Sequence, residues 1–336
     1  MTKTYPRFKA AACHAAPVFL DAARSIDKAC DLIAEAVRNG ARLVAFPESF
    51  VPGFPVWLAV QAPIHNHRFF AALAAEALTL DHPLMGKLRD AARKHGVVVS
   101  LGFTEGTLAS VGCLWNSNVL IDSDGGILNL HRKLMPTFYE KLVWAPGDAR
   151  GLRVKETGIG RIGMLICGEN TNPLARFALM AEGEQVHVSS YPPIWPTRPV
   201  TNNKRYDLRR AIEVRAAAHA FEAKAFNIVA SAAVDDSMRK AVGTEPGLLE
   251  LIDRSPRGVS MVLGPTGDLV SETLSENEGI VYAEIDVADC IEPKQFHDVV
   301  GGYNRFDIFK LEIDRTPREP AHFIDGTPDP AKDAAQ

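Results

Sequence analysis

Short apolar runs alternate along the chain with longer segments in which apolar residues recur every three or four positions. Short apolar runs are typical of buried β-strands, and the longer spacing is typical of amphipathic helices. The pattern predicts strands at Phe8–Ala12, Arg42–Phe46, Val97–Phe103, Ser117–Ile121, Ile159–Cys167, Gln185–Ser190, Ala225–Ala233, Val259–Leu263 and Ile280–Ile285. It predicts helices at Ala22–Arg38, Arg68–Leu78, Met85–Lys94, Pro173–Ala181 and Arg205–Lys224.

The order of these elements combines βα alternation with hairpins. It predicts an α/β protein with mixed sheets and with helices on the outside. The sequence DSDGG at Asp122–Gly126 indicates a hairpin turn between two strands. The helix at Pro173–Ala181 has Asn172 as a possible cap, and Gly183 follows its end. The polar stretch Val234–Arg257 predicts a long surface loop.

The chain shows no internal repeat and no clean linker, so we expect one domain over residues 1–312. Residues 313–336 contain little that could pack in a core. Such a segment is expected to form an extended or disordered tail. Its prolines are Pro317, Pro320, Pro328 and Pro330.

The composition narrows the class of protein. The chain has 336 residues, 46% of them hydrophobic, and a formal net charge of −4. No Lys/Arg-rich stripe appears, so we expect no nucleic-acid partner, and no apolar run approaches the ~18 residues of a membrane helix.

The five cysteines show neither a CxxC pair nor metal-ligand spacing, which is typical of reduced thiols in the cytoplasm. His14 and Pro17 interrupt the N-terminal apolar segment, so it is interpreted as a first strand.

Three apolar runs end in polar residues that could act together. ARLVAFPES ends near Glu48, GGILNLHRK ends at Lys133, and RIGMLIC ends at Cys167. If these runs are neighbouring strands, the three side chains emerge at one edge of a sheet, where α/β folds usually carry chemistry. The lysine would favour the thiolate, and the glutamate could take the thiol proton. Each signal alone is weak, because a cysteine that ends an apolar run is more often a small buried hydrophobe.

The segments FPESFVPGFPVW, HRKLMPTFYEKLVWAPGD, CGENTNPLARF and HDVVGGYNRFDIF are more specific. Over about residues 8–311 the chain resembles the carbon–nitrogen hydrolase superfamily, and more closely its nitrilase branch. The resemblance implies a four-layer α-β-β-α sandwich and a catalytic triad of Glu48, Lys133 and Cys167, with Glu140 as a second glutamate. It implies hydrolysis of a nitrile to a carboxylic acid and ammonia, without a metal or an organic cofactor. It also implies a homodimer or a larger homo-oligomer.

The same resemblance suggests substrate-binding positions. The backbone N–H after Cys167, at Gly168, is a plausible oxyanion donor, and aromatic residues form a possible pocket wall. Many nitrilases have Trp at the position of Gly168 and Tyr at the position of Phe54, so we expect the pocket to differ from that of relatives. A structural role for Gly168, permitting an unusual backbone angle in the turn, stays open. The possible wall residues are Phe54, Trp57, Tyr191 and Trp195.

Other interpretations remain or are set aside. An amidase or carbamoylase of the same superfamily would keep the triad, and a non-catalytic assembly module would keep only the fold. GIGRIG at 158–163 matches a dinucleotide motif, but it precedes a strand and is interpreted as a hairpin turn. The HNH at 65–67 has no further metal ligand nearby and is interpreted as a loop. His131, His187 and His219 could pair with a cysteine, although His187 and His219 are more often structural.

Overall fold

The computed structural model describes residues 4–199, 201–202 and 205–317. Its strands form two mixed sheets that face each other. The strand order of the first sheet is β11 (Gly279–Asp286), β1 (Arg7–His14), β2 (Ala41–Ala45), β3 (Val98–Glu105), β4 (Trp115–Ile121) and β5 (Ile127–Arg132). The order of the second is β10 (Met261–Leu263), β9 (Phe226–Ser231), β8 (Val186–Tyr191), β7 (Gly160–Ile166) and β6 (Lys155–Thr157).

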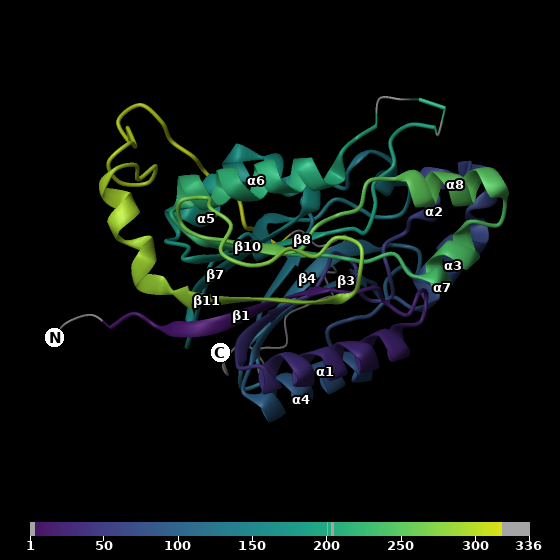
Figure 1. Ribbon diagram of the computed structural model, residues 1–336, viewed down its shortest axis with the longest axis horizontal. Helices are drawn as coiled ribbons and strands as arrows, with labels where there is room; N and C mark the ends of the chain where they lie inside the picture. The colour runs from purple at the N-terminus through teal and green to yellow at the C-terminus, as the bar shows by residue number, and fades with distance from the viewer. Residues whose placement is uncertain (1–3, 200, 203–204, 318–336) are drawn as a thin grey trace, which may run out of the picture.

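Helices cover the outer face of each sheet, which completes a four-layer α-β-β-α sandwich (Figure 1). The helices α1 (Ala22–Arg38) and α4 (Pro83–His95) pack on the first sheet. The helices α5 (Pro173–Ala181) and α6 (Leu208–Ala223) pack on the second. Shorter helices gather at one end of the sandwich, and these are α2 (Trp57–Val60), α3 (His67–Ala75), α7 (Asp236–Val242) and α8 (Pro246–Arg254). The predicted fold class is therefore confirmed. No helix within the described residues has the length and apolar character needed to cross a bilayer.

The strand β1 contributes side chains to two separate apolar cores, one on each face of its sheet. Side chains on a strand alternate between the two faces of its sheet. Ala10 and Ala12 belong to the apolar core between the sheets, whereas Ala11 and Cys13 belong to the core beneath α1 and α4. All four are fully buried. A strand that is buried on both faces has no polar alternation, and this explains the continuous apolar run in the sequence.

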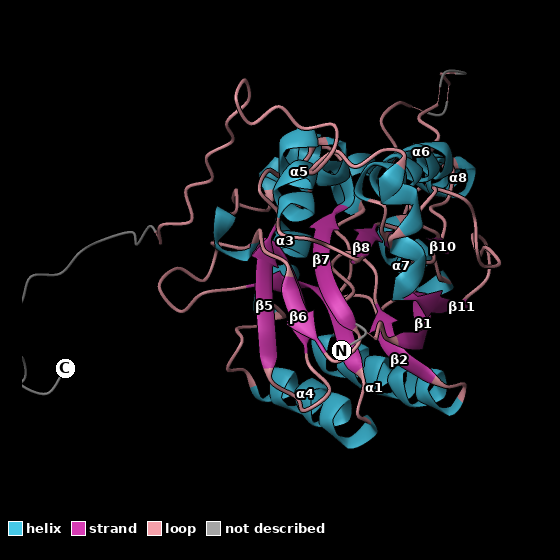
Figure 2. Ribbon diagram, turned by 90° about the vertical axis from the view of Figure 1, so that its left-hand side faces the viewer, coloured by secondary structure: helices cyan, strands magenta, loops and turns pink. Residues whose placement is uncertain are grey.

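Several local predictions are confirmed. Residues 122–126 form the turn between β4 and β5, and GIGRIG forms the hairpin between β6 and β7 (Figure 2). The side chain of Asn172 caps α5, with Pro173 at its first position. Gly183, just beyond the end of α5, has a φ of +75°. These turns were recognisable because Asn, Gly and Pro each satisfy a particular backbone requirement.

Two predictions need correction. The stretch Val234–Arg257 is not a long loop, because it contains α7 and α8, which bury Met238, Val242 and Ile252. Its apolar residues are few, but they recur at helical spacing and pack on the end of the sandwich. The start of the predicted tail also packs, since Arg315 forms an ion pair with Glu182 (2.6 Å). Residues 318–336 of the tail lie outside the described residues.

Glycine allows two loops to approach the sheet closely. A Cβ atom on Gly102, in β3, would lie 2.3 Å from Pro47 O and 2.7 Å from Ser49 N. A Cβ on Gly147 would lie 2.7 Å from Lys133 O. Real Cβ atoms do not approach backbone atoms so closely. These two glycines therefore fix the path of the chain beside Glu48 and beside Lys133.

We predict that Gly102→Ala lowers the free energy of unfolding by about 1–3 kcal/mol, the usual cost of overpacking a core. The matched control is Gly86→Ala in α4, where a Cβ would meet nothing within 4 Å. That change should stabilise the protein by about 0.5–1 kcal/mol, because Ala is the better helix former. Urea unfolding of both variants is the measurement. Equal stability of the two variants would contradict the close approach at Gly102.

Candidate active site

Glu48, Lys133 and Cys167 meet, but not along one sheet edge. Glu48 follows β2 and Lys133 follows β5 in the first sheet, where β3 and β4 separate the two strands. Cys167 follows β7 in the second sheet. The expectation of three neighbouring strands is therefore wrong. The site is built across the sandwich, from the ends of strands that face each other.

The ammonium group of Lys133 lies between two carboxylates. Its Nζ donates to Glu48 Oε1 (2.7 Å) and to Glu140 Oε2 (2.6 Å), and all three side chains are buried. Asn116 in β4 supports this arrangement, because its Nδ2 donates to Glu48 Oε1 (2.7 Å) and its carbonyl accepts from Lys133 N (2.8 Å). Glu140 is fixed by a capping box in the short 3₁₀ helix Phe138–Leu142, where its Oε2 accepts from Thr137 N (2.9 Å).

Burial and charge together set the protonation of the site. Burial raises the pKa of Glu48 to about 7, and Glu140 adds to the shift while Lys133 opposes it. Burial alone would lower the pKa of Lys133, but the charges of Glu140 and Glu48 hold that pKa well above its ordinary value. Lys133 therefore stays charged, and Glu48 can exchange a proton near neutral pH.

The Cys167 thiol is not kept ionised by its lysine, contrary to the expectation from sequence. Burial raises its pKa well above the ordinary value, Glu48 raises it further, and Lys133 offsets only part of the shift. The thiol is 4% exposed. A base is therefore needed to make the thiolate. Oε2 of Glu48 is buried and has no hydrogen-bond partner among the described residues, so it is free to accept that proton.

The backbone is strained at each segment of the site. Cys167, Ser49 and Phe138 have φ values of +50°, +46° and +52°, a left-handed conformation that costs energy in residues with a side chain. Ser49 follows Glu48, and Phe138 lies two residues before Glu140. The predicted strand ends at Ile166, and Cys167 opens the 3₁₀ helix Cys167–Thr171.

One carboxylate joins the lysine segment to the cysteine turn. Oε2 of the buried Glu169 accepts from Ile166 N (2.8 Å) and from His131 Nε2 (2.9 Å), and its Oε1 accepts from Leu134 N (2.5 Å). Ile166 precedes Cys167, and Leu134 follows Lys133. Glu169 thus fixes the distance between the two sheets at the site. His131 is engaged in this contact, so its possible pairing with a cysteine is replaced by a pairing with Glu169.

A second polar network supports the turn from behind. Asn170 Nδ2 donates to Cys167 O (3.1 Å), and its Oδ1 contacts His187 Nε2 (2.9 Å). Glu184 contacts His187 Nδ1 and His219 Nε2, each at 2.6 Å. Such contacts are hydrogen bonds, since ligands of one tetrahedral zinc ion lie about 3.3 Å apart when each bond is about 2.0 Å. His187 is hydrogen-bonded through both ring nitrogens, whereas His219 is bonded only through Nε2, and both have the structural role that the sequence suggested. The network lowers the pKa of Glu184 to about 2 despite burial.

The suggested pocket residues divide into two groups. Tyr191 and Trp195 lie in the apolar cluster that contains Cys167. Phe54 contacts Trp144 edge-on (ring centroids 5.6 Å apart) in a neighbouring cluster. Trp57 packs between two phenylalanines, stacked on one and edge-on to the other, as a core residue does.

Gly168 has a packing role rather than a conformational one. Its φ is not left-handed, since the residue with the unusual angle is Cys167. A Cβ on Gly168 would lie 2.8 Å from Thr137 Oγ1. The interpretation that Gly168 permits an unusual angle is therefore wrong. Residue 168 is small because Thr137 occupies the adjacent space.

The residues that sequence reasoning missed are supporting ones. Asn116 and Glu169 hold the reacting side chains, and no periodicity distinguishes them from ordinary strand or turn residues. The sequence pointed to Glu169 only through its position in CGEN, two residues after the cysteine. The charges of Arg215 in α6 and Cys167 also act on each other.

Comparison with known proteins identifies the family. Residues 9–295 match the carbon–nitrogen hydrolase family. A nitrilase of Paraburkholderia phymatum is 34% identical over 93% of this chain and 88% of that protein. A bromoxynil-specific nitrilase of Klebsiella pneumoniae is 36% identical over 94% and 87%. A carbon–nitrogen hydrolase structure from Helicobacter pylori superposes with a TM-score of 0.69, at 22% identity over 86% and 92% of the two chains.

The structure thus combines a buried thiol with a buried carboxylate–ammonium pair on a four-layer sandwich. The chain belongs to the carbon–nitrogen hydrolase family.

We predict that Glu169→Gln lowers the free energy of unfolding by about 1–3 kcal/mol, because an amide cannot accept from all three buried donors. Glu284→Gln is the control, since its exposed ion pair with Lys9 is worth at most about 1 kcal/mol. In the folded protein, burial raises the pKa of Glu169, but the contacts with His131, Leu134 and Ile166 outweigh burial and lower it. The ionised form therefore stabilises the fold above the unfolded pKa of about 4.3.

This stabilisation is lost as the pH falls through the lowered folded pKa. The difference between wild type and Glu169→Gln should therefore shrink in acid. Chemical unfolding between pH 7 and pH 3 tests this trend. A difference that is constant with pH would contradict the assignment of an ionised Glu169.

Proposed function

We propose that the protein hydrolyses an organic nitrile to a carboxylic acid and ammonia. The observation that carries this proposal is the buried contact of Lys133 with Glu48 and Glu140 beside the Cys167 turn. Relatives at 34–36% identity that carry the name nitrilase support the nitrile as substrate. Amidase structures that share the fold are about 18% identical and bear on the fold alone.

The proposed reaction passes through two covalent intermediates on Cys167, a thioimidate and then a thioester. Glu48 takes the thiol proton, Cys167 Sγ forms a bond to the nitrile carbon, and the proton passes to the nitrogen to give a thioimidate. Water adds to this carbon, the C–N bond breaks, and ammonia leaves with its electron pair after protonation. The remaining thioester reacts with a second water, the C–S bond breaks, and the acid leaves as Cys167 regains its proton.

The other residues stabilise charge. Lys133 holds positive charge beside the nitrogen and beside the tetrahedral oxygen as negative charge develops there. Glu140 positions Lys133 through their 2.6 Å contact. The backbone N–H of Gly168 donates to the developing oxyanion. A fixed ammonium in a water-poor site needs no reorganisation during the reaction, and this is why such groups lower the barrier effectively.

We also propose that the chain works as a homodimer or larger homo-oligomer in the cytoplasm. All five cysteines are free, as in proteins of reducing compartments. The segment after β11 exposes large apolar side chains, which monomeric proteins seldom display together. These are Phe296, Tyr303, Phe306, Ile308 and Phe309, each more than half exposed.

We predict that the purified protein releases ammonia from a panel of nitriles and that Cys167→Ala abolishes this activity while the protein remains folded. Cys113→Ala is the control, because Cys113 lies in the loop before β4 and has no role in the site. Ammonia release, with circular dichroism for folding, is the measurement. Release from the matching amides but not from nitriles would favour the amidase alternative instead.

We predict that Glu48→Gln lowers kcat by about 10²–10⁴-fold, the usual contribution of general acid–base catalysis. In the wild type, activity should fall as the pH drops below about 7, because Glu48 must be ionised to act as a base. The folded pKa of Glu48 lies above its unfolded value, so its ionisation reduces stability as the pH rises.

The Gln variant should therefore be at least as stable as wild type at pH 8. Full activity, or a large loss of stability at pH 8, would contradict the role of Glu48 as a buried base. Activity and thermal unfolding are measured on the same preparations.

A further inference from the structure

Arg215 is a cation without a partner of opposite charge. It lies in α6, the helix against which the Cys167 turn packs, and it is only partly exposed. Its Nη2 donates to Tyr206 Oη (2.5 Å). Among the described residues, no Asp or Glu forms an ion pair with it. Charges withdrawn from water are normally paired, because an unpaired one is costly. A guanidinium left unpaired beside a reactive thiol therefore suggests that a ligand supplies the anion.

A continuous aromatic wall connects Arg215 to the reacting groups. Tyr139, next to Glu140, contacts Trp195 (ring centroids 5.2 Å apart), and Trp195 contacts Tyr206 edge-on (5.4 Å). Tyr206 in turn accepts from Arg215. The wall therefore runs from the lysine segment to the guanidinium, and a small molecule lying along it would reach from one to the other.

The wall carries further donors that have no partner. Tyr139 Oη, Tyr191 Oη and Trp195 Nε1 are buried and make no hydrogen bond to any described residue. Tyr191 is fully buried in the cluster that contains Cys167. Buried polar groups are normally satisfied. Tyr191 and Tyr206 lie within electrostatic reach of Arg215, and Trp195 contacts Tyr206, so an oxygen-rich anion at the guanidinium would meet the open donors of Tyr191 and Trp195.

The positive charge of Arg215 and the negative charge of the ionised Cys167 also stabilise each other. Burial would lower the pKa of Arg215, but Cys167, Tyr191 and Tyr206 raise it above its ordinary value. In turn Arg215 offsets part of the rise in the pKa of Cys167 that burial causes. These directions agree with the packing of α6 against the Cys167–Thr171 turn.

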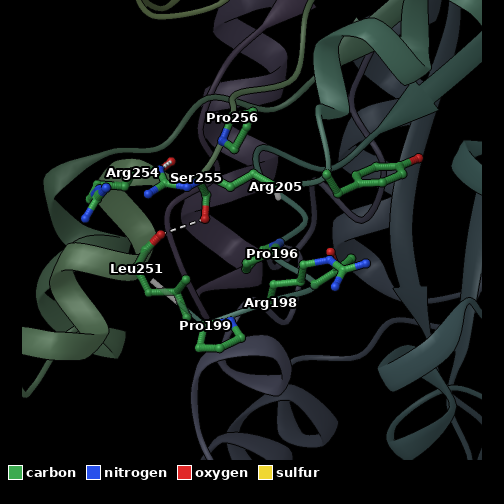
Figure 3. A pocket seen from close by; sticks show the side chains of 10 residues that line it. Pro196, Arg198, Pro199, Arg205, Leu251, Arg254, Ser255 and Pro256 are labelled. Atoms are coloured by element: carbon green, nitrogen blue, oxygen red, sulfur yellow. Dashed lines mark hydrogen bonds between the residues drawn. The ribbon is translucent and has the colours of Figure 1, made fainter. Parts of the chain in front are cut away.

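The pocket in Figure 3 continues this positive region outward. It shares Tyr206 with the wall, and three arginines line it, Arg198, Arg205 and Arg254. Arg254 pairs with Glu250 (2.7 Å), whereas Arg198 and Arg205 form no ion pair within the part of the chain that the structure describes. A lining of one sign of charge attracts ligands of the other.

We propose that the substrate carries a second, anionic group, a carboxylate in its simplest form, and that Arg215 binds this group while Cys167 attacks the nitrile. The proposal rests on the proposed function and adds a substrate class to it. Arg215 binds the carboxylate through its free guanidinium nitrogens, the geometry that makes arginine the usual carboxylate ligand. Tyr191 and Trp195 complete the site as hydrogen-bond donors.

The first experiment does not depend on nitrile hydrolysis. Cys167 is alkylated with iodoacetate, an anion, and with iodoacetamide, its neutral counterpart, and the rates are measured by mass spectrometry of the Cys167 peptide. In both reactions Sγ bonds to the methylene carbon and iodide leaves with the bonding electrons. Arg215→Gln should lower the ratio of the iodoacetate rate to the iodoacetamide rate by about tenfold, since a charged hydrogen bond is lost.

Two variants serve as controls. Arg215→Lys keeps the charge and should retain part of the preference for iodoacetate. Arg210→Gln removes a solvent-exposed charge from the same helix, where Arg210 lies near Glu213 (3.7 Å), and it should leave the ratio unchanged. An unchanged ratio in Arg215→Gln overturns the proposal. An equal fall of both rates also overturns it, because Arg215 would then act on the thiol or on the fold.

The second experiment compares two nitriles of similar shape, 4-cyanobutanoate and 5-oxohexanenitrile, in which a methyl ketone replaces the carboxylate. The wild type should prefer the anion in kcat/KM, and Arg215→Gln should remove the preference, mainly through KM. Turnover of both nitriles with no effect of Arg215 would overturn the substrate class and leave the proposed function intact. An Arg215-dependent iodoacetate preference without turnover of any nitrile would overturn the proposed function alone.

Discussion

The site depends on one buried ammonium group held between two buried carboxylates. Lys133, Glu48 and Glu140 would carry a net charge of −1 if all three were ionised, and burial withdraws them from the solvent that would disperse it. The cluster lowers this energy by raising the proton affinity of Glu48. The same negative charge helps to keep the Cys167 thiol protonated. Glu48 and Cys167 therefore compete for one proton, and this competition is the basis of the proposed chemistry.

The two-sheet architecture is what brings these groups together. Glu48 and Lys133 already meet within the first sheet, where their side chains bridge the two strands that separate β2 from β5. Facing sheets allow β7 to deliver Cys167 from the opposite side, and Glu169 holds the two sides at a fixed separation through three hydrogen bonds. Left-handed backbone at Ser49, Phe138 and Cys167 directs the chain into the site. The apolar core between the sheets supplies the free energy that maintains this strain.

Apolar periodicity was sufficient for most of the elements and for the α/β class, whereas the four-layer sandwich was expected from the family resemblance. The run at β1 and the capping signals at α5 are local, so they could be predicted without knowledge of the fold. The helices in Val234–Arg257 were missed because few of their residues are apolar and their burial depends on distant segments. The positions of Glu48, Lys133 and Cys167 came from family motifs. Their mutual distances depend on the pairing of two sheets, which no local pattern encodes.

The distribution of unpaired groups separates the reaction centre from substrate recognition. Around Glu184 and Glu169 the buried carboxylates have hydrogen-bond partners within the chain, and these contacts serve the fold. The partly exposed Arg215 has no acidic partner among the described residues, and the buried hydroxyl of Tyr191 has no hydrogen-bond partner there. Lys133 donates to two carboxylates, Glu48 and Glu140, so we do not expect it to bind an anionic substituent of the substrate. In the proposed substrate class, the anionic group is therefore bound from α6, at the opposite end of the aromatic wall.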